Sequence, residues 1–151
     1  MPRLSVRPVP AATVHPLRGK VLRPGHPPEA AHFPGDDAAE TIHLAGFLQG
    51  AEAPVAVASL YREPPPGEHS ADAFRLRGMA VDESLQGQRL GGELLDACME
   101  ALRTRGALFL WCNARTSASG FYLSRGFTRE GGEEPFDIPG VGPHFQMRRP
   151  L

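Results

Sequence analysis

Residues 78–102 read GMAVDESLQGQRLGGELLDACMEAL, an extended run that is followed by an amphipathic helix. Between the two lies QGQRLGG, residues 86–92, which we call the glycine-rich loop. A helix N-terminus has unpaired backbone N–H groups and a partial positive charge, and glycine lets a ligand approach the backbone closely. The loop therefore predicts either a phosphate-binding site or a plain tight turn, and from its residues alone both interpretations stay open.

Two common nucleotide-binding patterns are missing from this loop. The pattern GxxxxGK[ST] needs a lysine, and the loop has none. The dinucleotide fingerprint GxGxxG is absent as well. The sequence therefore argues against nucleoside triphosphate hydrolysis and against NAD binding.

Length and composition indicate an ordinary globular protein. A chain of 151 residues is most simply one domain, residues 1–151, with room for a sizeable core. A net charge of −1 argues against nucleic acid or membrane binding driven by bulk charge. The sequence has no apolar leader and no long apolar run, so we expect a cytoplasmic protein. The two cysteines, Cys98 and Cys112, fit buried free thiols rather than a disulfide framework or a zinc site.

The pattern of apolar residues predicts an α/β protein. Helices are expected at 11–22, 91–105 and 116–126, and strands at 4–9, 40–50, 53–63, 73–82, 107–114, within 127–134 and at 144–150. Residues 23–37 and 135–143 are expected to be loops, because proline and glycine are dense there. The helix at 91–105 would be the crossover that joins two parallel strands, which predicts a mixed α/β sheet.

Two segments resemble the signatures of the GNAT superfamily of N-acetyltransferases. VDESLQGQRLGGELL, residues 81–95, resembles the loop that holds the acyl-CoA pyrophosphate, with pattern Gln/Arg-x-x-Gly-x-Gly/Ala. Gln86, Gly87, Gln88, Leu90 and Gly91 fit this pattern, whereas Arg89 stands where the family usually has its first glycine. About 30 residues on, NARTSASGFYLSRGF, residues 113–127, is similar to the second signature, A-x-x-F-Y-x-x-x-G-F. The front end and GVGPHFQM, residues 140–147, resemble a bacterial branch that includes ElaA-like proteins.

The resemblance implies a fold, a cofactor and an activity. The fold is a mixed, mostly antiparallel central sheet with a splayed parallel pair at the acyl-CoA site and helices on both faces. The implied activity is direct transfer of an acetyl group from acetyl-CoA to a primary amine of a small molecule or peptide through a ternary complex. The residues that would contact the cofactor are Met79, Ala80, Val81, Gln86, Gly87, Gln88, Arg89, Leu90, Gly91, Gly92, Asn113, Ser117, Phe121 and Tyr122.

Roles within this set follow from chemistry. The resemblance makes Tyr122 the catalytic acid, because a phenol can protonate the departing CoA sulfur. Positive φ at Arg89 would be costly, so either the loop differs from the family's or φ is already negative there. The base that deprotonates the amine is left open between His43, His144 and a water chain, with Glu63 and Asp82 as weaker candidates.

The sequence says less about the part of the site that would bind the acceptor amine. The loops 24–40, 64–72 and 131–143 are expected to form it, and Arg75 and Arg77 would favour an anionic acceptor if they line the cleft. The six histidines have no close ligand spacing, so no metal is expected. A homodimer is common in the family. The competing function is a non-catalytic acyl-CoA-binding sensor or partner-binding module on the same fold, and an acyl group larger than acetyl is a third alternative.

Overall fold

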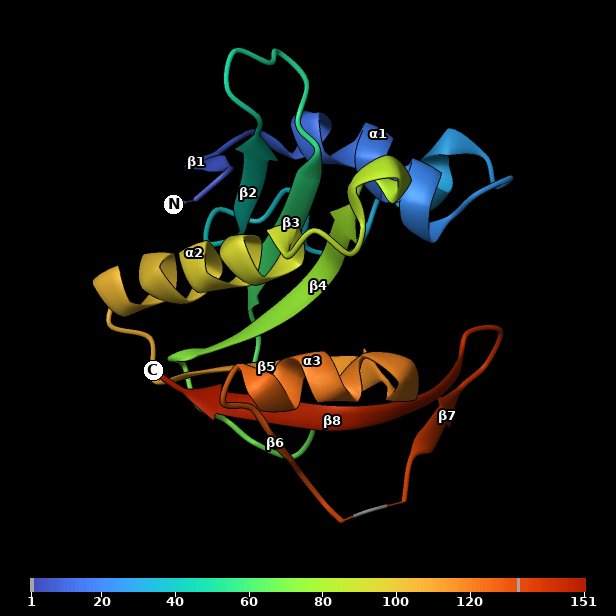
Figure 1. The fold of residues 1–151 in the computed structure, drawn as a ribbon. Coiled ribbons are helices and arrows are strands. Elements are labelled where there is room, and N and C mark those ends of the chain that lie inside the picture. The colour runs from blue at the N-terminus through green and yellow to red at the C-terminus, as the bar shows by residue number, and fades with distance from the viewer. Residues whose placement is uncertain (1, 133) are drawn as a thin grey trace.

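The computed structural model describes residues 2–132 and 134–151, and their fold is an open sheet with helices on both faces (Figure 1). The helices are α1 (Ala11–Leu22), α2 (Leu90–Thr104) and α3 (Ser119–Ser124), with short 3₁₀ turns η1 (Pro28–Ala31), η2 (Glu83–Leu85) and η3 (Thr116–Ala118). The strands are β1 (Ser5–Pro8), β2 (Ile42–Phe47), β3 (Ala56–Arg62), β4 (Ala73–Val81), β5 (Phe109–Arg115), β6 (Thr128–Arg129), β7 (Phe136–Ile138) and β8 (Gly142–Pro150).

Within the described residues, the eight strands form a single sheet in the order β1-β2-β3-β4-β5-β8-β6, with β7 paired to β8. Neighbouring strands run antiparallel except β4 and β5, which are parallel and joined through α2. The prediction of a mixed, mostly antiparallel sheet with one parallel pair is therefore confirmed.

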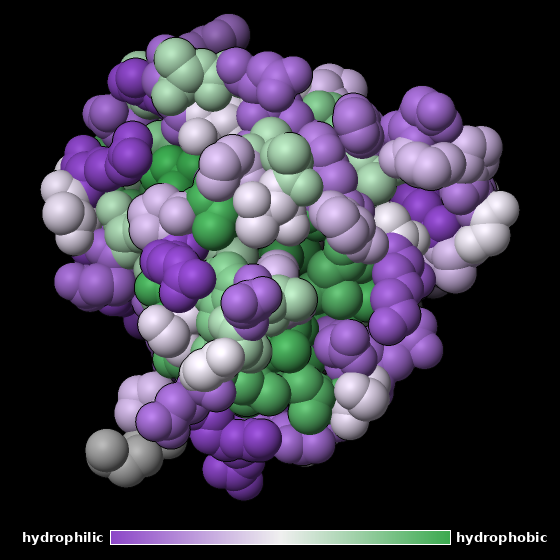
Figure 2. Space-filling view, turned by 90° about the horizontal axis from the view of Figure 1, so that it is seen from above, coloured by the Kyte–Doolittle hydropathy of each residue, from purple (hydrophilic) through white to green (hydrophobic). Residues whose placement is uncertain are grey.

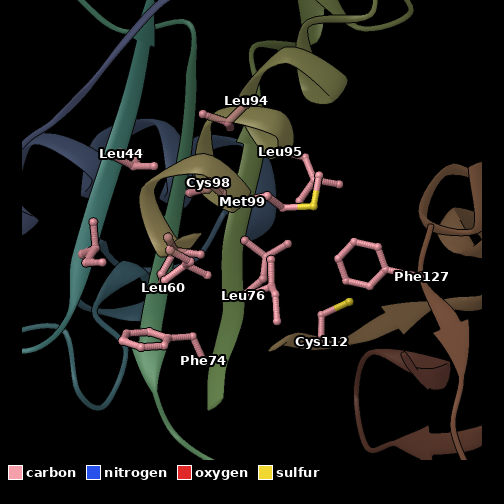
Figure 3. Close-up of a cluster of buried hydrophobic side chains, with 14 of the residues drawn as sticks. Leu44, Leu60, Phe74, Leu76, Leu94, Leu95, Cys98, Met99, Cys112 and Phe127 are labelled. Carbon is pink, nitrogen blue, oxygen red and sulfur yellow. The ribbon is translucent and has the colours of Figure 1, made fainter. Parts of the chain in front are cut away.

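The two longer helices cover opposite faces of the sheet. On one face α1 buries Val14 and Leu17 against β2 and β3. On the other face the apolar stripe of α2 contacts the sheet, as the close-up of the core shows (Figure 3). The stripe consists of Leu94, Leu95, Cys98, Met99 and Leu102, all buried. Each fully buried leucine contributes about 1.5–3 kcal/mol to stability, so this stripe accounts for why the segment folds as a helix here.

A β-bulge in β4 sets the geometry of the site. In the pairing of β3 with β4, Ser59 lies opposite Arg77 and Val57 opposite Ala80, so Gly78 and Met79 together face one residue of β3. Gly78 has φ +66°, and a Cβ there would lie 2.7 Å from Nε of Arg18. Glycine is required at this point because the backbone is left-handed and a buried side chain passes against it.

The segment 135–143 differs from its prediction as a loop. Residues Phe136–Ile138 form β7, which pairs antiparallel with β8, and β8 begins at Gly142 rather than at residue 144. The turn between the strands uses positive φ at Gly140 and Gly142, +77° and +117°. These glycines indicate a hairpin turn as much as a loop, and the prolines of the segment lie outside β7 itself. Of the expected strand within 127–134, β6 covers Thr128–Arg129, and residue 133 lies outside the described residues.

The face of the molecule seen from above is mostly polar (Figure 2). Seen from above, hydrophilic residues cover most of the face, with a hydrophobic stretch in its middle (Figure 2). Of the large exposed hydrophobic residues, Leu108 and Leu123 lie in separate segments, whereas Phe136 and Val141 both lie in the β7–β8 hairpin. No described helix has the length and apolar character needed to cross a bilayer.

Candidate active site

The parallel pair of strands separates soon after it forms. Pairing between β4 and β5 covers only Ala73–Arg75 with Phe109–Trp111. Beyond these residues the edge of β4 that faces β5 pairs with no described strand, and the two strands diverge (Figure 1). A cleft of about 340 Å³ opens at this point. It is lined by residues of β4, β5, α3, the end of α1 and the β7–β8 hairpin, namely Leu22, Arg23, Phe33, Arg75, Leu76, Arg77, Gly78, Met79, Cys112, Asn113, Ala114, Arg115, Ala118, Tyr122, Ile138, Val141 and His144.

Residues of β4, α2 and α3 meet near Met79 and Gly91. A Cβ built on Gly91, at the start of α2, would lie 3.3 Å from Cε of Met79 and 3.9 Å from both Phe121 and Val81. On the other side of Met79, the Tyr122 hydroxyl lies 4.0 Å from its Sδ. Met79 belongs to the bulge, and it packs against the core cluster that contains the apolar stripe of α2. Five residues predicted from two separate motifs are thus brought together at one point.

The glycine-rich loop presents a row of free backbone donors. The N–H groups of Gly87 through Gly92 have no backbone or side-chain acceptor among the described residues. The first intrahelical bond of α2 runs from the N–H of Glu93 to the carbonyl of Arg89, 3.4 Å away. The loop therefore combines unpaired donors with the positive end of a 15-residue helix, an arrangement that suits a diphosphate.

The N-terminal segment and α3 surround this loop. The guanidinium of Arg3 donates to the side-chain carbonyl of Gln88 at 2.6 Å, which places a further positive charge beside the loop. On its other side, Arg125 forms a two-pronged ion pair with Asp96 of α2, at 2.9 and 2.8 Å. That guanidinium lies against Gly92, where any side chain would displace it. The Gln86 amide donates to the Val81 carbonyl at 3.0 Å and ties the loop back to β4.

Arg89 is left-handed, with φ +67° and ψ +13°, and among the described residues it is the one non-glycine with positive φ. The prediction that φ could be negative here is wrong, and the loop retains the backbone shape that a glycine would adopt. The cost of this conformation for a non-glycine residue is about 1–2 kcal/mol. A loop under such strain at the start of a helix is typical of a site that binds a ligand.

We expect Arg89→Gly to raise the free energy of unfolding by about 1 kcal/mol, because glycine relieves the strain and only part of the gain is lost to extra freedom in the unfolded chain. Urea denaturation measures this directly. If Arg89 also contacts a bound phosphate, the same variant will bind acetyl-CoA more weakly while being more stable. A less stable variant would contradict the strain argument.

Tyr122 has an unusual environment for a buried hydroxyl. The Tyr122 ring packs edge-on against the rings of Phe121 and Phe127, at centroid distances of 5.1 and 5.2 Å. Within the described residues, the hydroxyl has only sulfur partners, the Met79 thioether at 4.0 Å and the Cys112 thiol. Burial, with the neighbouring Cys112 and Cys98, raises the pKa of Tyr122 above its ordinary value, so the phenol stays protonated. A hydroxyl held among weak acceptors remains available to donate to a ligand.

The cysteines are buried free thiols, as predicted. Burial raises the pKa of each to about 12. Neither is a thiolate near neutral pH, which argues against an acyl-enzyme on Cys112 although that residue lines the cleft.

Two of the candidate bases differ sharply in position. His43 is enclosed by a network, with Nε2 donating to the Asp36 carbonyl at 2.8 Å and Nδ1 paired to Ser59 at 2.6 Å. His144 lines the cleft, and its Nδ1 donates to the Gly142 carbonyl at 2.7 Å, which leaves the Nε2 lone pair as the free acceptor. Of the weaker candidates, Glu63 pairs with Arg75 at 3.0 Å and Asp82 caps Ser84, and neither lines the cleft.

The remaining predicted residues divide between the cleft and its surroundings. Asn113 lines the cleft. The side chain of Ala80 packs towards α1, so only its backbone faces the gap. Ser117 is exposed, and it is Ser119 that bonds the Thr116 carbonyl at the start of α3. Leu90 is buried in the core with α2. Of the loops expected on the acceptor side, 24–40 and 131–143 supply Phe33, Ile138 and Val141 to the cleft lining, whereas no residue of 64–72 lines it.

Sequence reasoning missed a buried polar network beside the cleft. The Asp36 carboxylate accepts hydrogen bonds from Arg18, His15, Tyr61 and the backbone N–H of Phe33. Arg18 is fully buried and also donates to Ser59 at 2.7 Å and to the Ala31 carbonyl at 2.8 Å. These partners come from α1, the 23–41 segment and β3, and no local motif marks them. The network anchors the loop that carries Phe33 into the cleft.

Comparison with known proteins identifies the family and the fold. The family described as Acetyltransferase (GNAT) domain matches residues 42–129. The uncharacterised N-acetyltransferase YitI of Bacillus subtilis is 34% identical over 148 residues, covering 98% of this chain and 97% of its own. The structure of Escherichia coli ElaA superposes with TM-score 0.76 at 18% identity, over 97% of this chain and 99% of its own. An aminoglycoside 6′-N-acetyltransferase complexed with coenzyme A does so with TM-score 0.74 at 11% identity, over 97% and 96%.

Proposed function

Because the chain belongs to the GNAT family of N-acetyltransferases, we propose that it transfers an acetyl group from acetyl-CoA directly to a primary amine of a small molecule or peptide. The observation that carries this proposal is the convergence of Gly91, Met79, Val81, Phe121 and Tyr122 beside the splayed strands. One continuous sheet supports treating residues 1–151 as one catalytic domain.

Acetyl-CoA fits the cleft and the loop together. The unpaired edge of β4 at Met79–Val81 would hold the amides of the pantetheine arm, and the free N–H groups of Gly87–Gly92 would hold the pyrophosphate. Arg89 and Arg3 would add charge beside the phosphates, and Asn113 would face the arm from β5. A coenzyme A complex on the same fold supports this choice of ligand.

Two residues would move the protons. We assign Tyr122 as the acid that donates to the departing CoA sulfur, since its hydroxyl is protonated and has only weak partners in the protein. We assign His144 as the base for the amine, because its tautomer leaves Nε2 free and it lines the same cleft. His43 then acts as a member of the buried network, not as the base.

We expect His144→Gln to lower kcat at neutral pH by roughly 10- to 100-fold. This loss is smaller than the loss of an irreplaceable base would cause, because water can take the amine proton in place of His144. The loss should shrink as the pH rises and the amine arrives unprotonated. His69→Gln, an exposed histidine outside the cleft, is the matched control. A deficit that stays constant across the pH range would remove His144 from the role of base.

Calorimetric titration with acetyl-CoA tests the proposed function. We expect the native protein to bind, and Gly91→Asp to weaken binding by roughly 100-fold because a carboxylate would stand beside the pyrophosphate. Gly91→Asn, of nearly equal size but neutral, should lose much less, which separates charge from bulk. No binding by the folded native protein would show that residues 86–92 are only a turn.

An amine screen then separates the enzyme from a binding module. Release of coenzyme A in the presence of an amine supports the transferase. Tight binding of acetyl-CoA without release of coenzyme A, whichever amine is added, supports the sensor or partner-binding alternative. Comparing acetyl-CoA with longer acyl-CoA thioesters in the same assay tests the length of the acyl group.

A further inference from the structure

The cleft has a strongly cationic wall. Four arginines and a histidine line it, Arg23, Arg75, Arg77, Arg115 and His144, and none of the described lining residues is an aspartate or glutamate. The bulge in β4 comes after Arg75 and Arg77, so their side chains share one face of the strand. Much of this charge therefore faces the cleft without a carboxylate inside it.

Three of the protein's guanidinium groups surround one aromatic ring. The Cζ atoms of Arg18, Arg77 and Arg23 lie 4.2, 4.5 and 5.3 Å from the centroid of Phe33. Arg18 is neutralised by Asp36, with an ion-pair distance of 2.7 Å. Cation–π contact holds such groups in place but does not cancel their charge. The other two guanidiniums remain as positive charges on the cleft side of the ring.

Among the three arginines around Phe33, Arg77 has the fewest partners for its positive charge. It is half-buried, and in the part of the chain that the structure describes it forms neither a hydrogen bond nor an ion pair. Burial and the nearby Arg75 lower its pKa, with a further lowering from Arg18. The one hydrogen bond of the Arg23 side chain among the described residues goes to the Leu22 carbonyl at 2.9 Å. Arg75 differs, because Glu63 pairs with it at 3.0 Å outside the cleft.

We propose that the acceptor carries, besides its amine, a carboxylate or phosphate group that Arg77 binds together with Arg23, with Arg115 at the mouth of the cleft. The proposal rests on the proposed function and names the substrate class of the same site. An oxyanion would give Arg77 the charge-assisted hydrogen bonds that the protein does not supply. A polyamine or a basic peptide would instead meet four arginines.

The dimensions favour a small acceptor. Arg77 lies two residues before Met79 on β4, so their Cα atoms are at most about 7 Å apart, the span of two extended residues. Met79 contacts Tyr122, where the thioester would react. A few bonds between the amine and the acidic group are enough to span this distance, as in a short amino acid or an amino-alkyl phosphate.

Matched acceptor pairs test the inference. The carboxylate arm compares β-alanine with β-alaninamide, the phosphate arm compares O-phosphoethanolamine with ethanolamine, and 1,4-diaminobutane represents a cationic amine. For at least one pair we expect kcat/KM of the anionic member to exceed that of the neutral member by roughly 10- to 100-fold. Which arm responds tells carboxylate from phosphate. Equal rates within both pairs, or a preference for the diamine, would overturn the inference while leaving the transferase intact.

Variants show which residue binds the acidic group of the acceptor. Arg77→Gln should remove the preference, with the KM for acetyl-CoA changing by no more than about twofold, whereas Arg105→Gln, exposed at the far end of α2, should behave as the native protein. A large rise in the KM for acetyl-CoA in Arg77→Gln would assign Arg77 to the cofactor and overturn the inference.

A second readout does not depend on finding the acceptor. With coenzyme A saturating, so that its own phosphate sites are filled, inorganic phosphate or succinate should raise the Tm of the native protein and of Arg105→Gln but not of Arg77→Gln. The inference would be overturned if these anions do not raise the Tm of the native protein and no anionic amine of the panel is acetylated. Failure of the native protein to bind acetyl-CoA at all would instead refute the proposed function.

Discussion

Tyr122→Phe is expected to lower kcat by roughly 10²- to 10⁴-fold, the range lost with a positioned acid. The phenyl ring keeps the edge-on contacts with Phe121 and Phe127, so the acetyl-CoA affinity should change little. Without the hydroxyl, the CoA sulfur would have to leave as an unprotonated thiolate. Steady-state kinetics with calorimetric binding of acetyl-CoA would measure the two effects separately.

The environment of the Tyr122 hydroxyl predicts that the loss of kcat comes from the missing acid and not from a disturbed fold. The partners of the hydroxyl are sulfur atoms, so its removal should change the free energy of unfolding by less than about 1 kcal/mol. Because the pKa of Tyr122 is raised by burial, its ionisation should not lower kcat of the native enzyme at any pH below 10. An unchanged kcat in Tyr122→Phe would leave Tyr122 as a packing residue only.

The other tyrosine in the sequence gives a matched control. Tyr61 donates a hydrogen bond of 2.5 Å to Asp36, and burial together with that carboxylate raises its pKa to about 12. Tyr61→Phe should therefore show the reverse pattern, a loss of stability with little change in the chemical step. If both tyrosine variants lost kcat equally, a general disturbance of the fold would explain the result better than acid catalysis.

The cofactor side of the site could be predicted because its determinants are local. Gly91 and Gly92 at the start of α2, and Phe121 and Tyr122 at the start of α3, lie in continuous segments whose spacing carries the pattern. The resemblance implied that these residues share one cofactor site, and the structure brings Gly91, Phe121 and Tyr122 close to Met79. The positive φ of Arg89 was not, because propensity disfavours it and only the surrounding turn imposes it.

The acceptor side could not be predicted in the same way. β7 lies among prolines and glycines that obscure a short strand, and it exists because β8 offers a partner. Phe33 looks like any loop residue until three arginines, one from α1, one from the end of that helix and one from β4, meet its ring. Such contacts depend on residues far apart in the chain and carry no periodicity.

Asp36→Asn tests the largest of these unpredicted features. The carboxylate accepts two hydrogen bonds from Arg18, at 2.7 and 3.2 Å, and further bonds from Tyr61, His15 and the Phe33 backbone. The substitution leaves the fully buried Arg18 guanidinium without a counter-charge, so we expect a loss of about 3–5 kcal/mol in the free energy of unfolding. That is a large share of the roughly 5–15 kcal/mol that stabilises a typical domain.

The pH dependence has a definite sign. Burial alone would raise the pKa of Asp36, but the hydrogen bonds from Arg18, Tyr61, the Phe33 backbone and His15 hold it well below its ordinary value of 3.8. A carboxyl whose pKa is depressed in the folded state contributes stability that is present above pH 3.8 and is lost as the pH falls towards the folded pKa. The difference in stability between the native protein and Asp36→Asn should therefore narrow in acid below about pH 4.

A surface pair of the same chemistry is the control for this variant. Asp72 lies 3.9 Å from Arg62, both exposed, and Asp72→Asn should cost less than about 1 kcal/mol. If Asp36→Asn folds too poorly to measure, the double variant Arg18→Met/Asp36→Asn should recover part of the loss, because it removes the unpaired charge as well. Equal costs at Asp36 and Asp72 would mean that the network is not what holds the 23–41 segment.

The same variant connects stability to recognition. Asp36 fixes the backbone at Phe33, and Phe33 holds Arg77 and Arg23 at the cleft wall. Loosening this segment should raise the KM for an acceptor more than the KM for acetyl-CoA, because the glycine-rich loop lies on α2, on the opposite face of the sheet from α1. An equal rise in both values would indicate that the two halves of the site are coupled through the sheet. A change confined to the acceptor would show that the buried network serves to position the acceptor side of the cleft.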